Sequence, residues 1–516
     1  MAENMRTSNY VIYISLPEDD TRYIVHGYTG AADKVSAGTV QYLLDRMGPG
    51  PRSHTQDEEI ARESVRGRET VPPTPETVET LVRRGYLTER SPDEEREYIR
   101  QVFSFFYRRA VARAKPAFLF VPTYQCNMRC PYCYEAPSRS DLQKQHCIDE
   151  IMTREMADAA FRAMDVLITG SLKEPQTLAE AKRGAKVTLY GGEPLMRETA
   201  GIVDYLFHTL TEQGMRLDAI TNAVELDQFA PLLGPSRLEF IQVTLDGPRD
   251  VHNSKRRGPR YPEGTYDRIL SNIELALERQ VNVSLRVHLA KEHAQRAGEV
   301  MEDLDSRGLL ASKLLNVYAS PLHNFSRGYK PESYQLMLLH EAQDALEACS
   351  PTAQSGRTLR VIESQVGAKL RSCLQQSVAG LGQNPMFCGS QVGFYIFDPF
   401  GGVYKCWEDV GNPRLRVGSY FPDGLELNER EDEWRGRSAA DIPECADCKY
   451  LFFHAGGCAL AAPRSERGLM VPGCFDFEAD FVTFGRKFFQ TLETNPAVVD
   501  KSELEKGGEI VVQQGH

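Results

Sequence analysis

The chain has 516 residues, too many for a single hydrophobic core, so we expect two to four domains. Hydrophobic residues make up 41% and charged residues 26%, which are the ordinary shares of a soluble globular protein. The formal net charge of -12 argues against nonspecific binding to nucleic acid. No apolar run is long enough to span a membrane and no signal-peptide pattern opens the chain, so we expect a cytoplasmic protein.

The N-terminal residues predict two short strands followed by helices. Residues 10–15 and 23–28 alternate apolar and polar side chains as strands do, and residues 39–47 have helical periodicity. Residues 48–73 are charged, rich in Pro and Gly and nearly free of large apolar side chains. This composition predicts a mobile loop or linker.

Two further helices are expected before the next domain. Residues 75–84 place Val78, Leu81 and Val82 on one face, and a glycine ends the helix. The succession of helix, Gly, aromatic residue and Leu is common in winged-helix units. Residues 92–110 form another helix that leads into the next domain.

From Ala117 onward the pattern alternates between strand and helix. Strands that alternate with helices imply parallel βα units, in which the loops after the strands carry the chemistry. The candidate strands are residues 117–122, 186–190, 217–221, 240–245, 283–288 and 314–318.

Three cysteines, Cys126, Cys130 and Cys133, directly follow the first of these strands in T-Y-Q-C-N-M-R-C-P-Y-C-Y-E. A structural zinc site usually has four ligands in two close pairs, and no fourth cysteine lies near. Three thiolates can hold three corners of a four-iron cubane and leave the fourth iron open for a small molecule. The alternative is three unrelated cytosolic thiols.

The run C-N-M-R-C-P-Y-C-Y-E resembles the signature of the radical SAM superfamily, with Tyr132 as the aromatic residue before the third cysteine. The resemblance implies an α/β chain with a partial (β/α)6 TIM-like barrel and a 4Fe-4S cluster at these cysteines. It also implies that S-adenosylmethionine chelates the open iron. One electron would then cleave the sulfonium, and the resulting 5′-deoxyadenosyl radical would take a hydrogen atom from the substrate.

The segment Y-G-G-E-P follows the second strand and resembles the motif that binds the methionine amino group in this superfamily. Glycines let the backbone approach a ligand, and its carbonyls can accept hydrogen bonds from an ammonium group. Taken alone, the segment would be an ordinary turn. The implied cofactor-binding residues here are Gly191, Gly192, Glu193 and Pro194.

Polar residues at later strands complete the expected cofactor site. Thr221 and Asn222 can bond ribose hydroxyls or the methionine carboxylate, although Asn222 can equally cap the following helix. Arg286 lies on an otherwise apolar strand and needs an anionic partner, for which the cofactor carboxylate is a candidate.

The segment V-T-L-D-G-P-R-D-V-H-N-S-K-R-R resembles a strand end that is common in peptide-modifying members. The resemblance implies that Asp246 and His252 line the top of the barrel. Arg256 or Arg257 would then hold a carboxylate. The alternative for this basic cluster is a solvated loop.

The C-terminal third contains six clustered cysteines and a β-hairpin pattern that ends in K-C. The cysteine spacing resembles the SPASM domain of radical SAM peptide maturases, except that His454 occupies the place of one cysteine. Imidazole can replace thiolate on iron and generally raises the potential. The six cysteines are Cys388, Cys406, Cys445, Cys448, Cys458 and Cys474.

The SPASM resemblance implies two auxiliary iron–sulfur clusters. One would be held by Cys445, Cys448, His454 and Cys474, and the other by Cys388, Cys406 and Cys458. Phe394 stands where family members often supply a further ligand, so the second cluster would keep a vacant iron for substrate or for Cys373. Two alternatives stay open, namely that His454 is a bystander and that the region is a zinc ribbon.

Auxiliary clusters narrow the implied substrate to a peptide or protein side chain. The favoured function is maturation of a ribosomally made precursor peptide by a thioether, carbon–carbon or carbon–oxygen crosslink. The alternative is oxidation of a sulfatase residue to formylglycine, but sulfatase maturases place an aspartate where Trp407 stands. Glu408 and Asp409 are candidate bases in either reaction. A non-catalytic electron carrier or scaffold is the alternative of another class.

The expected partners are a precursor peptide and a reductant such as flavodoxin or ferredoxin, with neither nucleic acid nor membrane. The N-terminal strands and helices resemble the leader-recognition element of peptide maturases, which accepts the leader as an extra strand. The run from Tyr10 to Ser15 is the candidate edge for that strand.

These patterns predict the following domains: a leader-recognition domain at 1–112, the radical SAM barrel at 113–330, a helical linker at 331–380, a SPASM domain at 381–480 and a C-terminal helix and tail at 481–516.

Overall fold

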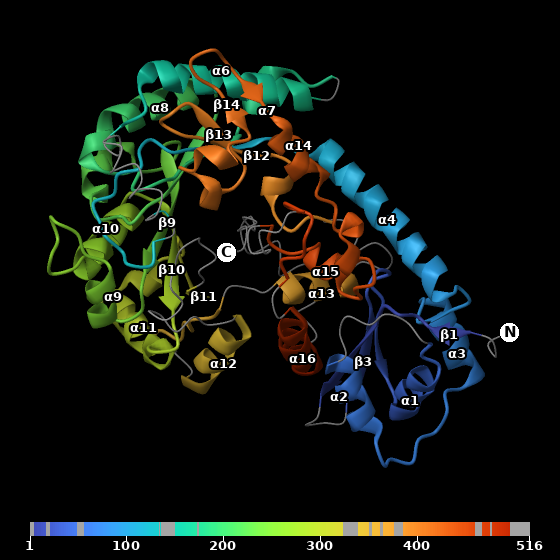
Figure 1. Ribbon diagram of the computed structural model, residues 1–516. Coiled ribbons are helices and arrows are strands. Elements are labelled where there is room, and N and C mark those ends of the chain that lie inside the picture. Colours follow the sequence, from blue (N-terminus) through green and yellow to red (C-terminus); the bar gives the residue numbers. More distant parts are fainter. Residues whose placement is uncertain are drawn as a thin grey trace. The chain divides into compact units, whose positions relative to one another are not determined.

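A computed structural model of the chain describes residues 5–16, 21–48, 56–133, 135, 150–172, 175–322, 339–349, 353–361, 365–375, 385–459, 467–474 and 477–495. The chain divides into two compact units, which are treated separately below (Figure 1). The barrel unit comprises Ala114–Ile362 and Val392–Trp434. The terminal unit comprises Met1–Arg113, Glu363–Gln391 and Arg435–His516.

The barrel unit contains six parallel strands in chain order, as the sequence predicts. They are β6 (Ala117–Phe120), β7 (Lys186–Leu189), β8 (Arg216–Ile220), β9 (Leu238–Leu245), β10 (Asn282–Leu289) and β11 (Leu315–Pro321). Their apolar side chains are buried, for example Val243 and Leu245 at 0% exposure. Burial on both faces is typical of parallel sheets that helices cover.

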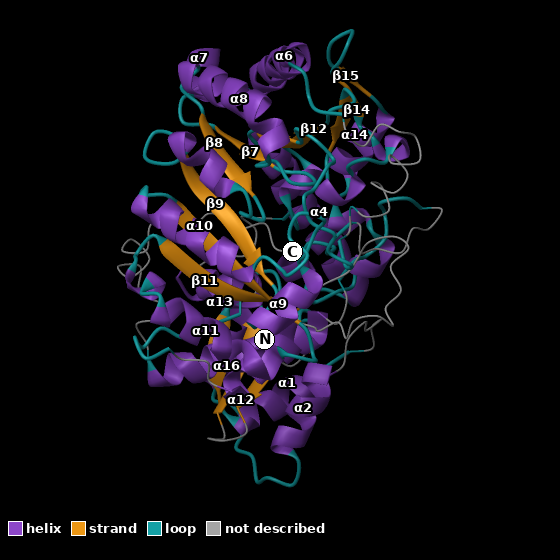
Figure 2. Cartoon of the chain, turned by 90° about the vertical axis from the view of Figure 1, so that its left-hand side faces the viewer, coloured by secondary structure: helices purple, strands orange, loops and turns teal. Residues whose placement is uncertain are grey.

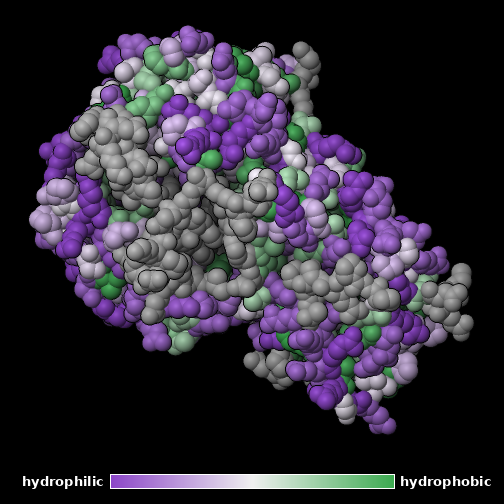
Figure 3. Space-filling model, viewed as in Figure 1, coloured by the Kyte–Doolittle hydropathy of each residue, from purple (hydrophilic) through white to green (hydrophobic). Residues whose placement is uncertain are grey.

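Helices surround this sheet on its outer side. Helix α10 buries Ile269, Leu270 and Ile273 because its apolar residues recur at helical spacing. Figures 1 and 2 show α8, α10 and α11 outside the strands, and Figure 3 shows a mostly hydrophilic outer rim. The helices of this unit are α6 (Arg154–Ser171), α7 (Leu178–Lys182), α8 (Ala200–Glu212), α9 (Arg249–Lys255), α10 (Tyr266–Glu278), α11 (Ala297–Ser306) and α12 (Leu339–Cys349).

The predicted C-terminal hairpin is present and extends the barrel sheet. Strand β12 (Phe394–Phe397) pairs antiparallel with β13 (Gly402–Tyr404) and parallel with β6, and two short strands follow, β14 (Gly418–Ser419) and β15 (Glu426–Leu427). The buried Asp398 caps the hairpin turn by accepting the Gly402 N–H at 2.6 Å. Tyr124, on the loop after β6, donates to the same carboxylate at 2.8 Å. Residues 392–434 therefore belong to the barrel unit, although the sequence places them in a separate domain.

The terminal unit begins with an antiparallel sheet in the order β2 (Val11–Leu16), β3 (Thr21–His26) and β4 (Ala32–Val35). Leu81, Val78 and Val82 pack into its apolar core as predicted. Helix α14 (Glu429–Gly436) crosses the boundary between the units. The other α-helices and strands of the terminal unit are β1 (Arg6–Thr7), α1 (Ala37–Asp45), α2 (Gln56–Val65), α3 (Pro75–Arg83), β5 (Leu87–Thr88), α4 (Pro92–Arg113), α13 (Gln365–Gln375), α15 (Leu451–His454) and α16 (Phe477–Thr494).

The expectation of a mobile loop at 48–73 is wrong for residues 56–65, which form α2. Its small apolar face, Ala61 and Val65, enters the core. Asp57 and Glu58 are buried because Lys449 lies beside both carboxylates, 3.2 Å from Glu58 Oε1. The segment has few apolar residues because part of what it buries is an ion pair. The cation of that pair, Lys449, lies far along the chain.

Strand β2 is at a sheet edge, as the leader-strand hypothesis requires, but α2 covers that edge. The backbone N–H of Tyr13 donates to Asp57 at 2.9 Å, and all six residues of β2 are buried. Strand β4 at the opposite edge is more exposed. The binding of a leader strand by this unit stays a prediction.

His26 should make the terminal unit sensitive to acid. Its ring is fully buried, Nδ1 accepts the Thr29 N–H at 3.3 Å, and burial lowers its pKa from 6.5 to about 3. Between these two pKa values the His26 ring is protonated in the unfolded chain but stays neutral in the folded chain. The free energy of unfolding therefore falls as the pH falls through this range. Opening the sheet should therefore cost about 1.4 kcal/mol less near pH 5.5 than near pH 7.5.

Hydrogen–deuterium exchange of β3 in the full chain, corrected for intrinsic rates, measures this difference. The variant His26→Asn should lose most of it. An equal pH effect in the variant would assign the acid sensitivity to another group.

Across the described residues, we find no helix with the length and apolar character that crossing a bilayer requires.

Candidate functional site

The three cysteines lie in the loop after β6 and are partly exposed. Cys126 Sγ accepts the Met128 N–H at 3.4 Å, and the Cys133 N–H donates to the Cys130 carbonyl at 3.2 Å. The described cysteines form no disulfides. Three accessible thiols on one short loop fit the open-cornered cluster that their spacing predicts.

The G-G-E-P loop packs directly on the cysteine loop. Gly191 has a φ of 119°, and a Cβ on Gly192 would lie 2.0 Å from the Gln125 carbonyl oxygen. The Glu193 N–H donates to that carbonyl at 2.7 Å. Only glycines permit this approach, so the loop is positioned against the residues that precede Cys126.

Glu193 ties the second and third strand ends together. Its carboxylate accepts the Thr221 hydroxyl at 2.6 Å, the Asn222 N–H at 2.6 Å and the Leu195 N–H at 2.8 Å. Burial raises the pKa of Glu193 to about 7, although these three donors oppose the shift. The side chains of Glu193 and Thr221 are thus occupied with each other.

Asn222 turns its amide toward the cysteine loop. Its Nδ2 donates to Asn127 Oδ1 at 2.8 Å and lies 3.9 Å from Cys126 Sγ. Asn127 Nδ2 is buried and has no hydrogen-bond partner among the described residues. An unmatched buried donor beside Cys126 fits a ligand that carries acceptor atoms.

Asp246 joins Tyr132 to the basic segment that follows β9. It accepts the Tyr132 hydroxyl and Arg256 Nε, the latter at 3.0 Å, and His288 Nδ1 lies 3.4 Å away. Burial acts to raise the pKa of Asp246, but Arg256 and His288 outweigh it and hold the pKa well below its usual value. The carboxylate that Arg256 holds is therefore Asp246 of the chain itself.

Two predicted residues of this segment form backbone contacts instead. The buried His252 accepts the Asp246 backbone N–H at 3.2 Å on Nδ1, and burial lowers its pKa to about 3. Arg257 contributes its carbonyl to the Arg129 N–H at 2.8 Å.

Arg286 on β10 has a hydroxyl neighbour but no acidic partner among the described residues. Its Nε and Nη2 lie 3.2 and 3.1 Å from Thr244 Oγ1. A half-buried guanidinium in this position fits an anionic ligand inside the barrel.

The end of the C-terminal hairpin approaches the same region of the barrel unit. Trp407 lies against Tyr190, with ring centroids 5.9 Å apart. Burial raises the pKa of Tyr190 far above its usual value, and the charges of Glu408 and Cys133 add to this effect. Burial and Asp409 raise the pKa of Glu408 to about 7. Asp409 itself is buried, 3.9 Å from Arg430.

Arg437, which the sequence did not single out, bonds to the backbone of the segment that leads into Cys458. Its guanidinium is 0% exposed and donates to the carbonyls of Leu469, Gly457, Gly456 and Val471 at 2.9–3.1 Å. No described carboxylate pairs with it. Burial lowers the pKa of Arg437, and negative charge on Cys445, Cys388 and Cys458 acts in the opposite direction. A buried cation among thiols fits an anionic cluster at those thiols.

His454 lies beside Cys448, with Nε2 3.2 Å from Sγ. Its Nδ1 accepts the Gly456 N–H at 2.9 Å, so the proton of the neutral ring is on Nε2, facing the thiol. In this arrangement His454 donates to the sulfur of Cys448.

Three observations concern the other cysteines and the metal sites predicted for the chain. Cys406 lies in the barrel unit, whereas Cys388 and Cys458 lie in the terminal unit, so their grouping stays a prediction. Within the described ranges, no three His, Cys, Asp or Glu side chains converge on a single metal ion. Cys147, for which no ligand role is predicted, lies outside the described residues.

Comparison with known proteins identifies part of the chain. Residues 120–304 match the Radical SAM superfamily, and this span contains the three cysteines, the G-G-E-P loop and Arg286. Residues 120–304 are a radical SAM domain. This confirms the superfamily that the cysteine signature indicates.

Two proteins with sequence similarity cover different shares of the chain. An uncharacterized protein from Archaeoglobus fulgidus is 23% identical over 359 residues, covering 68% of this chain and 75% of that protein. Fe-coproporphyrin III synthase from Methanosarcina barkeri is 27% identical over 193 residues, covering 37% of this chain and 41% of that protein.

Solved structures of anSMEcpe share the fold. The structure with bound AdoMet has a TM-score of 0.53 at 15% identity, covering 76% of this chain and 98% of that chain. The structure with bound AdoMet and Cp18Cys peptide has a TM-score of 0.50 at 13% identity, covering 75% and 99%.

Proposed function

We propose that the protein is a radical S-adenosylmethionine enzyme that installs a crosslink in a ribosomally made precursor peptide. The observation that carries this proposal is the radical SAM match over residues 120–304, a span that includes the three-cysteine loop, the unmatched Asn127 amide and Arg286. When bound, the cluster and S-adenosylmethionine supply reductive cleavage of the sulfonium and abstraction of a hydrogen atom.

The residues of the chain have distinct roles in this proposal. Cys126, Cys130 and Cys133 hold three irons of the cluster. The carbonyls of the G-G-E-P loop accept the cofactor ammonium, and Arg286 takes its carboxylate. Glu193 and Thr221 hold the loops in register, because their side chains bond each other. Asp246 and Arg256 fix Tyr132 next to Cys130.

Auxiliary clusters at the C-terminal cysteines form part of the proposal. Arg437 supports them, because a buried guanidinium without a carboxylate needs another anion. The hydrogen-bond pattern favours His454 as a donor to Cys448 over His454 as an iron ligand. In that case the auxiliary cluster predicted at Cys445, Cys448, His454 and Cys474 is held by the three cysteines alone.

A peptide substrate is supported by the likeness to anSMEcpe, which is solved with a bound peptide. That likeness supports sulfatase maturation equally, so formylglycine formation is the second candidate function. Trp407 favours the crosslinking reaction, since it stands where the maturase resemblance calls for an aspartate. Glu408, which follows the Trp407 that packs on Tyr190, is the candidate base in both reactions.

Anaerobic assay of the reconstituted enzyme with two peptides separates these functions. We expect the peptide encoded beside the gene to lose two hydrogens and gain a crosslink, with formation of 5′-deoxyadenosine. A sulfatase-derived Cys peptide should stay unchanged. Conversion of only the sulfatase peptide to an aldehyde would assign the second function, and no 5′-deoxyadenosine with any peptide would favour an electron carrier.

A further inference from the structure

The C-terminal half of α4 is basic although the chain as a whole has a net charge of -12. After Glu97 the helix contains no further Asp or Glu but has four arginines, Arg100, Arg108, Arg109 and Arg113. Arg108 and Arg109 are exposed, and no residue within the described part of the chain forms an ion pair with either. Their charge is therefore available to a partner.

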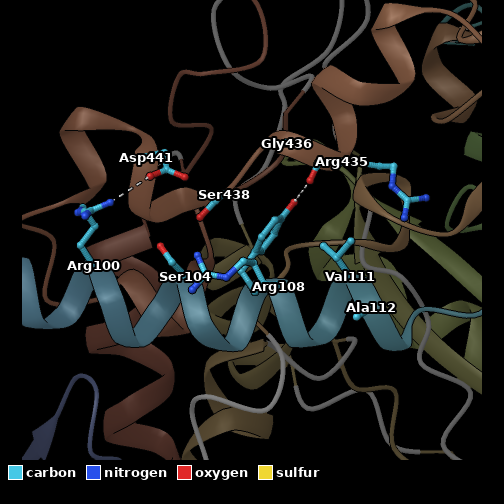
Figure 4. A pocket seen from close by; sticks show the side chains of 10 residues that line it. Arg100, Ser104, Arg108, Val111, Ala112, Arg435, Gly436, Ser438 and Asp441 are labelled. Atoms are coloured by element: carbon cyan, nitrogen blue, oxygen red, sulfur yellow. Dashed lines mark hydrogen bonds and ion pairs between the residues drawn. The ribbon is translucent and has the colours of Figure 1, made fainter.

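A cavity of about 420 Å³ lies between α4 and residues 435–441 of the same unit (Figure 4). Arg100, Arg108 and Arg435 line it together with Ser104 and Ser438, and the acidic residue in its wall is Asp441. Asp441 and Glu97 are already close to Arg100, at 3.9 and 2.8 Å. The cavity therefore keeps a net positive charge that Arg108 contributes, and it can receive a carboxylate.

The wall of this cavity reaches the candidate cluster ligands. Tyr107 donates to the Arg435 carbonyl at 3.0 Å. Gln391 lies within hydrogen-bonding reach of the Tyr107 phenol. The Gln391 side chain in turn accepts the Cys388 N–H at 3.4 Å and donates to the Arg437 carbonyl at 2.9 Å. A single side chain thus connects the cavity wall to the backbone of Cys388.

We propose that this basic cavity is the docking site of an acidic one-electron carrier protein, which places a carboxylate beside Arg108 and reduces the auxiliary cluster at Cys388. The carrier loses one electron and the cluster gains it, so no other reactant is needed. This inference rests on the proposed function, because it requires auxiliary iron. The net charge of the chain disfavours nucleic acid as the occupant, and an acidic leader peptide is an outcome of the test.

Charge reversal at the cavity tests the docking site. The variant carries Arg108→Glu and Arg109→Glu, and the matched control carries Arg62→Glu and Arg66→Glu, two exposed arginines of the same unit. The probe is a plant-type ferredoxin, and its binding is measured by calorimetry at low and high salt. We expect affinity for the cavity variant to fall about tenfold or more at low salt and the control to bind like the unchanged chain.

Rates of 5′-deoxyadenosine formation supply the second readout. With limiting reduced ferredoxin the cavity variant should be about tenfold slower, whereas dithionite should drive both proteins equally, because a small reductant needs no docking. Equal ferredoxin affinities, or equal losses with both reductants, overturn the proposal. Weakened peptide binding with unchanged ferredoxin affinity would assign the cavity to a leader instead.

The calorimetry also separates the two claims. If dithionite yields no 5′-deoxyadenosine with the unchanged chain, the proposed function fails. Salt-sensitive ferredoxin binding that depends on Arg108 would still support the docking site in that case. Absence of such binding to the unchanged chain overturns it.

Discussion

Replacing Cys126, Cys130 and Cys133 together by alanine should abolish formation of 5′-deoxyadenosine and leave the iron of the terminal unit in place. The three thiols are the proposed iron ligands of the radical SAM domain, and no other described cysteine lies on their loop. The fold should survive, because the Gln125 and Thr123 carbonyls, not the thiols, hold the loop against the G-G-E-P segment. Iron analysis and chromatographic detection of the cleaved nucleoside measure the two effects.

Cys349→Ala is the matched control for the triple variant. Cys349 belongs to the barrel unit, ends α12 and bonds only its own helix in the described structure, at 3.6 Å from the Leu346 carbonyl. It should retain full iron and full cleavage. If the triple variant still cleaves S-adenosylmethionine, the assignment of the cofactor site is wrong. If the triple variant loses all of its iron, the auxiliary clusters do not assemble independently of the cluster at these three cysteines.

The parallel strands could be predicted because their information is local. Buried strands such as β9 and β10 are short apolar runs bounded by turns, and amphipathic segments such as α10 separate them. The cysteine loop follows its strand directly, and the G-G-E-P loop follows the next one. Because strand ends meet at one edge of a parallel sheet, the sequence alone places these loops together.

Features that depend on distant partners could not be predicted in this way. Helix α2 has the composition of a linker, and its buried carboxylates become favourable only beside Lys449. The hairpin pattern was visible, but its pairing with β6 is set by an edge almost three hundred residues earlier in the chain. Periodicity carries no signal for such contacts.

The candidate site shows the same limit. The sequence predicts that Arg256 or Arg257 holds a carboxylate, but it does not show that Asp246 of the chain itself supplies one to Arg256. It gave His454 as a ligand from its place in the cysteine pattern, although only the Gly456 hydrogen bond reveals which ring nitrogen carries the proton. Arg437 had no sequence signal at all, because its significance lies in what surrounds it.

Replacing Arg437 by methionine should cause the largest loss at the auxiliary site. The change leaves four buried carbonyls without their donor and removes a cation whose charge is favourable to negative charge on Cys445, Cys388 and Cys458. Removing one member of a buried charge pair typically costs about 3–5 kcal/mol. In the background that lacks Cys126, Cys130 and Cys133, where only auxiliary iron is expected, we predict that most of the iron and its electron paramagnetic resonance signal disappear.

Arg437→Lys distinguishes the charge from the packing. Lysine keeps the cation but cannot reach four carbonyls, since its ammonium has three donors in place of the guanidinium fork. This variant should therefore retain part of the iron, at a midpoint potential close to that of the unchanged chain, and should unfold more readily. If the methionine variant instead keeps all its auxiliary iron at an unshifted potential, Arg437 balances no cluster charge. Its burial would then have to be explained by the four carbonyls alone.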